Sequence, residues 1–237
     1  YYMKKAGKDV TLIARGEHLK KIQKQGLTLE KMWDKTEENI SIPATDMEHY
    51  AEHPDVIFVC VKGYSLQETI PFIKRIARKN TIVIPVLNIY GTGGKMQKEL
   101  PDFLVTDGCI YVSANIKEPG KLLQHGQILH IVFGVRDKAE FRPELKEIQK
   151  DLCDSHIDGT LSENIRREAL EKFSYVSPIG AAGLYYHATA ADFQKEGEAR
   201  ELFKTMVKEI AALAEAMGVP FQKDMAEVNL KILSNLA

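Results

Sequence analysis

Three unbroken runs of apolar residues constrain the fold of this chain more than any other feature of its sequence. They cover residues 10–14, 55–61 and 81–87. Runs without apolar–polar alternation are typical of parallel strands that helices cover on both faces, because neither face then meets water. Helical patterns at residues 18–25 and 65–77 separate the runs. The order strand, helix, strand predicts a doubly wound α/β sheet.

The pattern changes twice further along the chain. Residues 108–134 predict short strands around a Pro119-Gly120 turn. Helical patterns then dominate, at residues 162–175 and 198–217. The second of these helices is expected to pack in a core through an apolar stripe, which consists of Leu202, Met206, Ile210, Leu213 and Met217. A sheet part followed by a helical part is therefore expected.

The composition excludes several classes of protein. The 237 residues carry a net charge of −1, so no basic field points to nucleic acid or to an anionic membrane. No apolar run approaches the roughly 20 residues of a membrane span, and no secretory signal pattern opens the chain. The three cysteines, Cys60, Cys109 and Cys153, are odd in number and widely spaced, which argues against a disulfide framework or a metal site. We expect a cytoplasmic protein without bound metal, in which Cys60 is a core residue.

A polar residue follows each of the three apolar runs. Arg15 follows the first, Lys62 the second and Asn88 the third. Ligands of open parallel sheets bind outside the carboxyl ends of the strands. If the runs are neighbours, the three side chains emerge along one edge, and we expect them to form a ligand-binding edge there. The alternative is that they only end their strands, as polar residues commonly do.

Arg15 indicates which ligand to expect at that edge. In a dinucleotide-binding sheet the end of the second strand faces the adenosine ribose, where an acidic residue favours NAD and an arginine accommodates the 2′-phosphate of NADP. Residues 1–35 also hold nine Lys or Arg against four Asp or Glu, although most of these lysines are expected only to solvate helix faces. The sequence therefore favours NADP as the cofactor.

The glycine motif of a dinucleotide-binding sheet is not found in the sequence. Such a sheet opens with a strand and Gly-x-Gly-x-x-Gly, which holds the pyrophosphate at a helix N-terminus. The sequence begins at Tyr1, within what its pattern predicts to be the first helix. Gly91, Gly93 and Gly94 follow the third apolar run and predict a loop instead. We therefore expect the first strand and the glycine motif of the fold to be missing from these 237 residues.

Several segments of the chain follow the pattern of one known family. Residues 1–19 match the stretch that follows the family's glycine motif, and Val-Cys-Val-Lys at residues 59–62 matches a second segment. Asn88 stands where the family has Asn-Gly, although Ile89 replaces the glycine here. The likeness continues to Gly134 and then weakens, so that the helical half matches mainly in layout. Together these segments resemble the ketopantoate reductases (2-dehydropantoate 2-reductases).

The resemblance implies a fold and an activity. It implies a Rossmann-type NADP-binding domain at residues 1–145. It also implies an all-helical domain for substrate binding and dimerisation at residues 150–237, similar to the C-terminal fold of 6-phosphogluconate dehydrogenase. This domain is expected to be truncated, because the family's substrate-binding serine and glutamate fall beyond Ala237.

The activity that the resemblance implies is the NADPH-dependent reduction of a 2-oxo acid. The expected substrate is 2-dehydropantoate, which is reduced to pantoate in pantothenate biosynthesis, and the resemblance allows a homodimer. Two alternatives stay open. One is a reductase of a different oxo substrate on the same fold, and the other is a non-catalytic NADP-binding protein.

Lys172 is the catalytic residue that the resemblance implies. The family's general acid is a lysine in a Trp-x-Lys segment on the first long helix of the second domain, and Leu170-Glu171-Lys172 stands at that place. The alternative is an exposed helix pair, because Glu168 precedes Lys172 by four residues. Val176 and Gly180 replace the asparagines that the family has four and eight positions after the lysine. These replacements argue against 2-dehydropantoate as the substrate more than against the fold.

Overall fold

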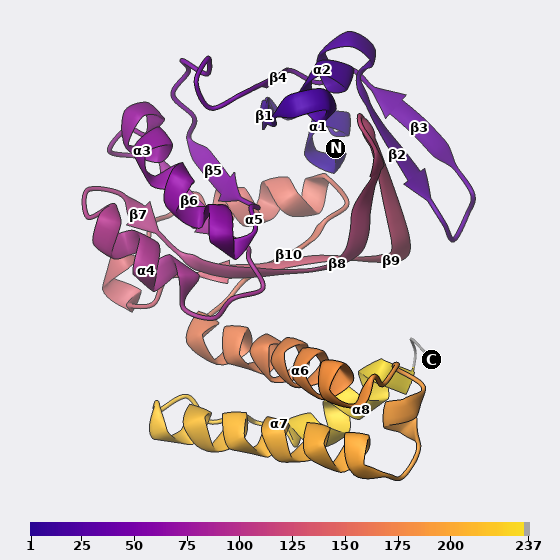
Figure 1. Ribbon diagram of the computed structural model, residues 1–237. Helices are drawn as coiled ribbons and strands as arrows, with labels where there is room; N and C mark the ends of the chain where they lie inside the picture. Colours follow the sequence, from indigo (N-terminus) through magenta and orange to yellow (C-terminus); the bar gives the residue numbers. More distant parts are fainter. Residues whose placement is uncertain (235–237) are drawn as a thin grey trace.

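The structure, a computed structural model, describes residues 1–234 and consists of an α/β part above a helical part (Figure 1). The strands are β1 (Leu12–Ile13), β2 (Leu27–Lys31), β3 (Glu37–Ile40), β4 (Ala44–Thr45), β5 (Val56–Val59), β6 (Ile82–Pro85), β7 (Leu104–Val105), β8 (Asp107–Glu118), β9 (Lys121–Gly134) and β10 (Asp158–Leu161). The helices are α1 (Tyr2–Lys5), α2 (Gly16–Gln25), α3 (Leu66–Ile76), α4 (Thr92–Glu99), α5 (Glu144–Asp154), α6 (Ile165–Tyr186), α7 (Glu198–Ala216) and α8 (Met225–Ser234). Short 3-10 helices are η1 (Gly63–Ser65), η2 (Lys138–Glu140) and η3 (Asp192–Gln194).

A parallel sheet of three strands forms the centre of the α/β part. β6 lies between β5 and β7 and is parallel to both. Val83 packs with α3 and α4 on one face of β6, whereas Ile82 and Ile84 pack with α5 on the other. The prediction that the runs at residues 55–61 and 81–87 are parallel neighbours is therefore confirmed.

The first apolar run differs from the prediction. β1 pairs in parallel with β4, and within residues 1–234 neither strand is hydrogen-bonded to β5. Ile13 is 39% exposed, so the run at residues 10–14 is not a buried strand. Cys60, directly after β5, is exposed rather than in the core. In the described chain β1 and β5 each have a hydrogen-bonded neighbour on one side only, so both lie at the edge of a sheet.

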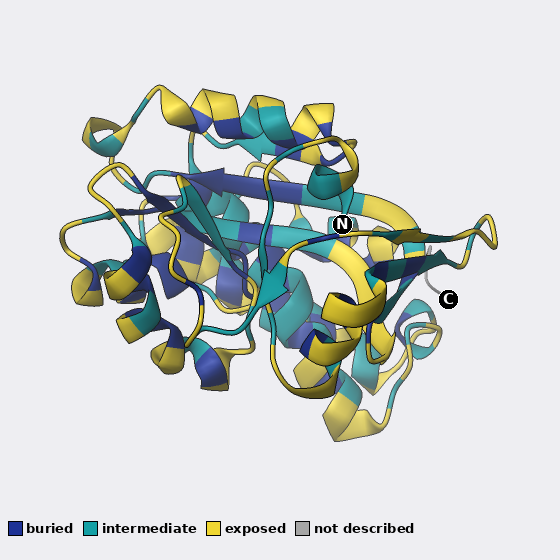
Figure 2. Cartoon of the chain, turned by 90° about the horizontal axis from the view of Figure 1, so that it is seen from above, coloured by how far each residue is buried: buried dark blue, intermediate teal, exposed yellow. Residues whose placement is uncertain are grey.

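A long hairpin, β8 and β9, holds the second sheet of the α/β part together. The two strands are antiparallel, and Pro119-Gly120 forms the predicted turn, with Gly120 at φ 80°. The strands are much longer than the short ones that the sequence indicated. On its other side β9 pairs with β2 through its first residues and with β10 through its last. The last residues of β9 are buried, whereas the half of β8 next to the turn is exposed (Figure 2).

The glycines after β6 begin a helix rather than a loop. α4 starts at Thr92 and contains Gly93 and Gly94, and Gly91 precedes it in the left-handed region at φ 74°. Gly93 lets α4 lie against the link between β7 and β8, since a Cβ there would come within 2.0 Å of the Thr106 carbonyl oxygen. The loop prediction was wrong because glycines at a close approach between helix and strand resemble the glycines of a turn.

Three helices pack together in the helical part. α6 has 22 residues and continues well past residue 175, through Pro178. α7 lies at the predicted residues, and Ile210 of the predicted stripe is buried. The other buried positions are shifted by one from the stripe, and Leu213 is 47% exposed. Phe203 occupies the core instead, where its ring centroid lies 5.5 Å from that of Phe193. The buried face of α7 consists of Phe203, Val207, Ile210 and Ala214.

The predicted fold class, a sheet part followed by a helical part, is confirmed. The boundary expected between residues 145 and 150 lies inside α5, and β10, which follows that helix, still pairs with β9. We therefore propose that the second domain starts at α6, and the division into two domains stays a prediction. Across residues 1–234, the helices are all too short or too polar to cross a membrane.

Candidate functional site

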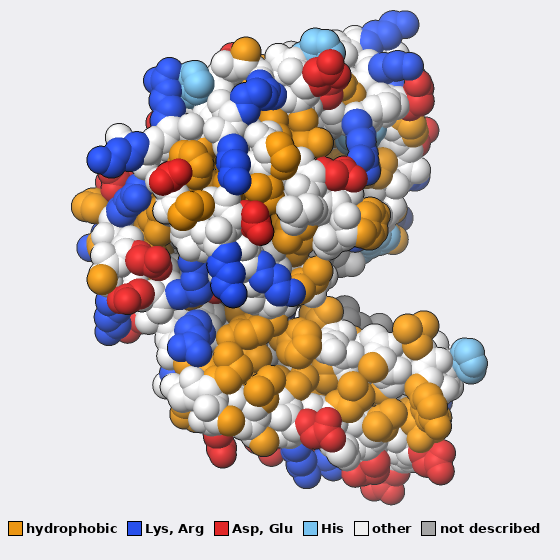
Figure 3. All heavy atoms as spheres, turned by 60° about the vertical axis from the view of Figure 1, so that its left-hand side comes forward, with side chains coloured by type: hydrophobic (Ala, Val, Ile, Leu, Met, Phe, Trp, Pro, Cys, Tyr) orange, Lys and Arg blue, Asp and Glu red, His pale blue; other side chains and the backbone are white. Residues whose placement is uncertain are grey.

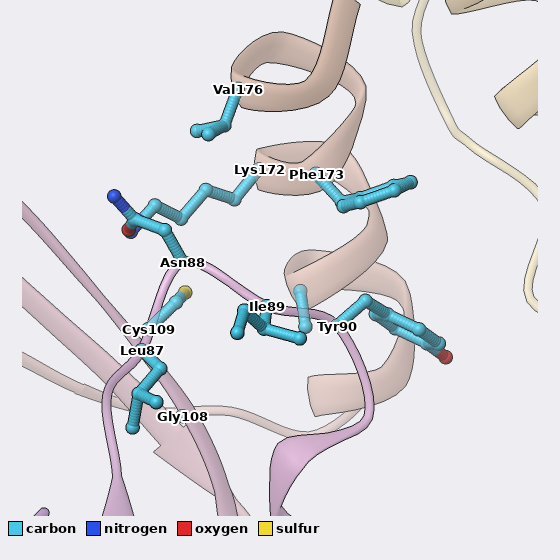
Figure 4. Close-up of a pocket in the computed structure, with 10 residues that line it drawn as sticks. Leu87, Asn88, Ile89, Tyr90, Gly108, Cys109, Lys172, Phe173 and Val176 are labelled. Atoms are coloured by element: carbon cyan, nitrogen blue, oxygen red, sulfur yellow. The ribbon is translucent and has the colours of Figure 1, made fainter. Parts of the chain in front are cut away.

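Lys172 lies on the face of α6 that is turned toward the α/β part. The helix begins after Asn164, whose Oδ1 atom accepts a hydrogen bond from the backbone N–H of Arg167 and so caps the first turn. Lys172 follows two turns later and is 7% exposed. Figure 3 shows a hollow between the two parts of the molecule, and Figure 4 shows Lys172 extending from α6 toward Asn88.

Three groups of the α/β part surround the Lys172 ammonium. Its Nζ atom donates one hydrogen bond to Oδ1 of Asn88 at 2.7 Å and another to the backbone carbonyl of Ile110. The centroid of the Tyr111 ring lies 5.0 Å from Nζ, within the range of a cation–π contact. An ammonium has three N–H donors, so these hydrogen bonds leave one donor for a ligand.

Gly108 allows Asn88 and Ile110 to lie side by side. Asn88 follows β6, and β8 begins beside the end of that strand. A Cβ at Gly108 would come within 2.9 Å of the Pro85 carbonyl oxygen, so a larger residue would push the strands apart. The end of β6 and the start of β8 therefore face α6 together.

Burial sets the electrostatics around Lys172. It lowers the pKa of the Lys172 ammonium from its ordinary value, because the charged form loses its water. The same effect raises the pKa of the Cys109 thiol to about 11 and raises the pKa of the Tyr111 phenol as well. The site therefore keeps its thiol and phenol neutral, and the ammonium is its cationic group.

The alternative of an exposed pair between Glu168 and Lys172 is wrong. The Glu168 carboxylate accepts a hydrogen bond from the Ser162 hydroxyl at 2.7 Å. Lys172 instead points into the molecule, and among residues 1–234 no carboxylate lies within ion-pair distance of its Nζ atom. An ammonium without a carboxylate partner is free to interact with a bound anion or a polarised carbonyl.

A small cavity lies against Lys172 and Asn88. Its volume is about 20 Å³, which is room for a single water molecule. Much of its wall is apolar, with Phe173 and Val176 from α6 and Ile89 from the loop after β6 (Figure 4). Val176 therefore faces the same space as the ammonium.

Arg15 and Lys62 lie outside this cavity. The Arg15 side chain, directly before α2, is 75% exposed, and its guanidinium lies 3.6 Å from the Glu68 carboxylate on α3. Lys62 is exposed at the start of η1. The next residue, Gly63, lies against the Ile89 side chain at the cavity wall.

Of the three polar residues in the expected edge, Asn88 lies beside this cavity, whereas Arg15 and Lys62 lie outside it. Asn88 and Lys172 come into direct contact, whereas no hydrogen bond or ion pair within the described chain joins Lys62 or Arg15 to them. The roles of all four side chains stay predictions. Sequence reasoning missed Ile110 and Tyr111. The Ile110 contact has no sequence signal, because every residue supplies a backbone carbonyl. Tyr111 lies within a strand, where an aromatic residue is ordinary.

Arg15 and Lys62 are the two predicted cofactor-binding residues that could hold a phosphate group, and this role stays a prediction. Both are exposed cations that follow the strands β1 and β5, and a guanidinium binds phosphate through paired hydrogen bonds. Glu68 partly neutralises Arg15 in this arrangement. Among residues 1–234, no three His, Cys, Asp or Glu side chains lie close enough together to bind a metal ion.

Two family models match the chain. The model for ketopantoate reductase PanE/ApbA matches residues 1–138, and the model for the C-terminal part of the same family matches residues 164–237. Together they cover most of the sequence, in the order of its sheet part and its helical part.

Curated relatives are distant in sequence. The protein called uncharacterized oxidoreductase YkpB, from Bacillus subtilis (strain 168), is 18% identical over 98% of this chain and 75% of its own length. The 2-dehydropantoate 2-reductase of Pyrococcus horikoshii is 28% identical over 74% of this chain and 56% of its own length. This chain therefore spans about half to three quarters of such relatives.

Solved structures share the fold. A ternary structure of D-mandelate dehydrogenase with NADH and anilino(oxo)acetate has a TM-score of 0.86 and 18% identity, over 98% of this chain and 74% of that one. A PanE/ApbA family ketopantoate reductase from Ralstonia eutropha JMP134 has a TM-score of 0.85 and 20% identity, over 99% of this chain and 75% of that one. At these identities the likeness establishes the arrangement of helices and strands.

Proposed function

We propose that this chain, which belongs to the ketopantoate reductase PanE/ApbA family, reduces the ketone of a 2-oxo acid with NADPH. The observation that carries the proposal is the buried Lys172 ammonium, which Asn88 and Ile110 hold while one N–H stays available. Reduction of a ketone needs a group that meets the negative charge developing on the oxygen. A fixed ammonium between the two parts of the molecule meets that need.

Lys172 acts as the general acid in this proposal. A bound reduced nicotinamide supplies the hydride. The available N–H of Lys172 donates a hydrogen bond to the ketone oxygen, stabilises the alkoxide as its charge builds, and transfers a proton to it. Burial favours this transfer, because the lowered pKa of Lys172 makes proton release near neutral pH easier than from an exposed lysine. Asn88 and Ile110 keep the ammonium oriented.

NADPH, rather than NADH, is the hydride donor that we propose. Arg15 supports this choice, because its exposed guanidinium can form charge-assisted hydrogen bonds to a 2′-phosphate. Lys62 adds a second cation after the neighbouring β5. Two observations favour NADH instead. Glu68 lies beside Arg15, and the D-mandelate dehydrogenase of the same fold was solved with NADH.

The substrate that we propose first is 2-dehydropantoate, because the family models and several relatives carry that activity in their names. A second candidate is a 2-oxo acid with an apolar side chain. Val176 favours it, since an apolar wall beside Lys172 offers no hydrogen bond to a substrate hydroxyl. A site that lacks such a partner discriminates by shape and apolar contact.

Substrate binding requires the site to open. The cavity beside Lys172 holds about 20 Å³, and a 2-oxo acid needs several times the volume of one water molecule. We propose that the two parts of the molecule move apart. Lys172 belongs to the helical part and Asn88 and Ile110 to the α/β part, so this motion separates the ammonium from both partners, and the hydrogen bonds form again when the parts close on the bound ketone.

The test is a panel of 2-oxo acids, with NADPH or NADH oxidation followed on the full-length protein. The panel includes 2-dehydropantoate, a phenyl-substituted 2-oxo acid and an aliphatic one, and a Lys172→Ala variant provides the background rate. Turnover of at least one acid with NADPH, lost in the variant, is the expected result. Tight NADPH binding without turnover of any acid would instead favour a non-catalytic NADP-binding protein. Loss of both binding and turnover would reject the proposal.

A further inference from the structure

We infer that Tyr111 is a positioning residue for Lys172, whose aromatic face holds the ammonium in the orientation that proton transfer needs. The inference rests on the proposed function, since it assigns Tyr111 a part in the same reaction. Tyr111 acts through Lys172 and has no assigned contact with a substrate.

The contacts of Tyr111 and its neighbour enclose the ammonium on one side. The Tyr111 ring centroid lies 5.0 Å from Nζ of Lys172, and the carbonyl of the preceding residue, Ile110, accepts a hydrogen bond from the same atom. Asn88 accepts the other hydrogen bond, from the loop after β6. Two consecutive residues of β8 and one residue of a separate loop therefore fix the position of Nζ.

The Tyr111 ring is itself held in place. His130 lies directly opposite Tyr111 in the β8–β9 pairing, and the two rings stack with centroids 5.4 Å apart and planes 26° from parallel. The Nε2 atom of His130 lies 3.1 Å from the hydroxyl oxygen of Thr160, which belongs to β10. A series of contacts thus runs from β10 through β9 and β8 to the lysine on α6. Such support restricts rotation of the Tyr111 side chain.

An aromatic face suits a lysine that must release its proton. A carboxylate at this position would hold the ammonium by a full charge and make its proton harder to remove. A ring holds the cation by its quadrupole, which is a weaker attraction. The titratable groups that face this region are Cys109 and Tyr111 on β8, Glu168 and Glu171 on α6, and His130 on β9 behind the ring. Asp158 of β10 lies 3.6 Å from Nδ1 of His130. Within the described chain none of these carboxylates, nor His130, contacts Nζ of Lys172.

Three variants distinguish the effect of the Tyr111 ring from the effect of its hydroxyl and from that of a general loss of packing. Tyr111→Phe keeps the aromatic face and removes the hydroxyl, whereas Tyr111→Leu removes the face. Tyr50→Leu is the matched control, because Tyr50 is a buried aromatic residue that packs against Phe72 in the α/β part, away from Lys172. Circular dichroism and thermal unfolding establish that each variant is folded.

The first measurement needs no turnover. The ¹³Cε chemical shift of Lys172, in protein labelled with ¹³C-lysine, is followed by NMR against pH and assigned with the Lys172→Met variant. Loss of the ring removes an attraction for the charged form, so Tyr111→Leu should increase the acid dissociation constant of Lys172 by about three- to thirtyfold. Tyr111→Phe and Tyr50→Leu should keep the wild-type midpoint. If the oxo-acid panel shows no turnover, this measurement still decides the inference.

The second measurement uses turnover of the acid that the panel identifies. Tyr111→Leu should lower kcat by about tenfold or more and move the alkaline limb of its pH profile to lower pH, while KM for NADPH is unchanged. Tyr111→Phe should retain most of kcat. A Tyr111→Leu protein with the wild-type titration midpoint of Lys172 and the wild-type pH profile would overturn the inference, and so would a Tyr111→Phe protein that behaves like Tyr111→Leu.

If Tyr111→Leu does not fold, a variant of His130 tests the inference instead. His130→Ala removes the ring that supports Tyr111 and leaves Tyr111 in place. It should shift the Lys172 midpoint in the same direction as Tyr111→Leu, by a smaller factor. An unchanged midpoint in a folded His130→Ala protein would count against a supported aromatic face.

Discussion

The Nζ atom of Lys172 lies 2.7 Å from Oδ1 of Asn88, although 84 residues separate them in the sequence. This hydrogen bond joins the helix that opens the helical part to the loop at the carboxyl end of β6. Each residue needs the other. Lys172 is buried and would lose one of its two hydrogen-bond acceptors, and Asn88 would present an amide to an apolar wall. A substitution at either residue would therefore change how the helical part and the α/β part lie against each other at the site.

Lys172→Ala should lower turnover of a 2-oxo acid by about 10²–10⁴, with NADPH binding nearly unchanged. Lys172→Arg should not restore the rate, because arginine keeps its charge but does not release a proton near pH 7. Steady-state kinetics for turnover and fluorescence titration for NADPH check the two expectations. Wild-type turnover in Lys172→Ala would remove the residue from the mechanism.

Lys172→Met should change how stability depends on pH. Burial depresses the folded-state pKa of Lys172 below its unfolded value, so between these two values the unfolded chain binds more protons than the folded one. The stability of wild type should therefore rise relative to Lys172→Met as pH increases from the folded-state pKa toward about 10.4, the ordinary lysine value. Urea unfolding of both proteins at a series of pH values measures this difference, in which all other titrating groups cancel. A constant difference would mean that burial does not shift this pKa.

Arg15→Ala should raise KM for NADPH by roughly ten- to a hundredfold, about 1.4–2.7 kcal/mol, and leave KM for NADH almost unchanged. Glu68→Gln is the converse change, since it removes the carboxylate 3.6 Å from the Arg15 guanidinium. It should lower KM for NADPH by about twofold to fivefold, the worth of an exposed ion pair. If either variant changed KM for NADPH and KM for NADH by the same factor, Arg15 would not bind the 2′-phosphate.

Val176→Asn should redirect substrate choice. An amide in the wall beside Lys172 can bind a substrate hydroxyl, and it is poorly matched to an apolar side chain. The ratio of kcat/KM for 2-dehydropantoate to that for an apolar 2-oxo acid should rise by about tenfold or more. KM for NADPH serves as the internal control and should not move. An unchanged ratio would indicate that Val176 does not contact the substrate.

Gly93→Ala and Gly94→Ala should have opposite effects on stability, although the two residues are neighbours in α4. A Cβ at Gly93 would come within 2.0 Å of the Thr106 carbonyl oxygen, whereas one at Gly94 meets only the Arg136 side chain at 3.9 Å. Gly93→Ala should lower the free energy of unfolding by about 2–3 kcal/mol. Gly94→Ala should raise it by about 0.5–1 kcal/mol, because alanine favours the helix. Urea unfolding of both variants checks the pair, and equal shifts would contradict it.

Much of the fold could be predicted because its elements have local signatures. The unbroken runs that became β5 and β6 are apolar throughout, and Pro119-Gly120 marks a turn by its chemistry. The sequence did not predict which face of α7 is buried. Two faces fit the same helical period: the predicted stripe of mostly leucine and methionine residues, and the buried face that contains Phe203. Packing against α6, η3 and α8 selects between them.

The candidate site was predicted in part for a different reason. Family resemblance indicated Lys172, and a strand end indicated Asn88, but their contact depends on how α6 lies against the sheet. Ile110 contributes a carbonyl that carries no sequence signature. Arg15 does follow the strand at residues 12–13, as the sequence indicated. In the described chain, however, β1 is not hydrogen-bonded to β5, so the local pattern could not show whether Arg15 lies on one sheet edge with Lys62 and Asn88.

The central place of β9 has a consequence for the order of folding. Its first residues pair with β2 and its last with β10, and β8 pairs with it along most of its length. β2 therefore cannot complete its parallel partnership until the chain has grown past Gln124, and β10 cannot do so before Leu161. Contacts between residues so distant in sequence form slowly. Until β9 has been synthesised, the β2–β3 hairpin has an open strand edge, and such an edge can pair with another chain and start aggregation.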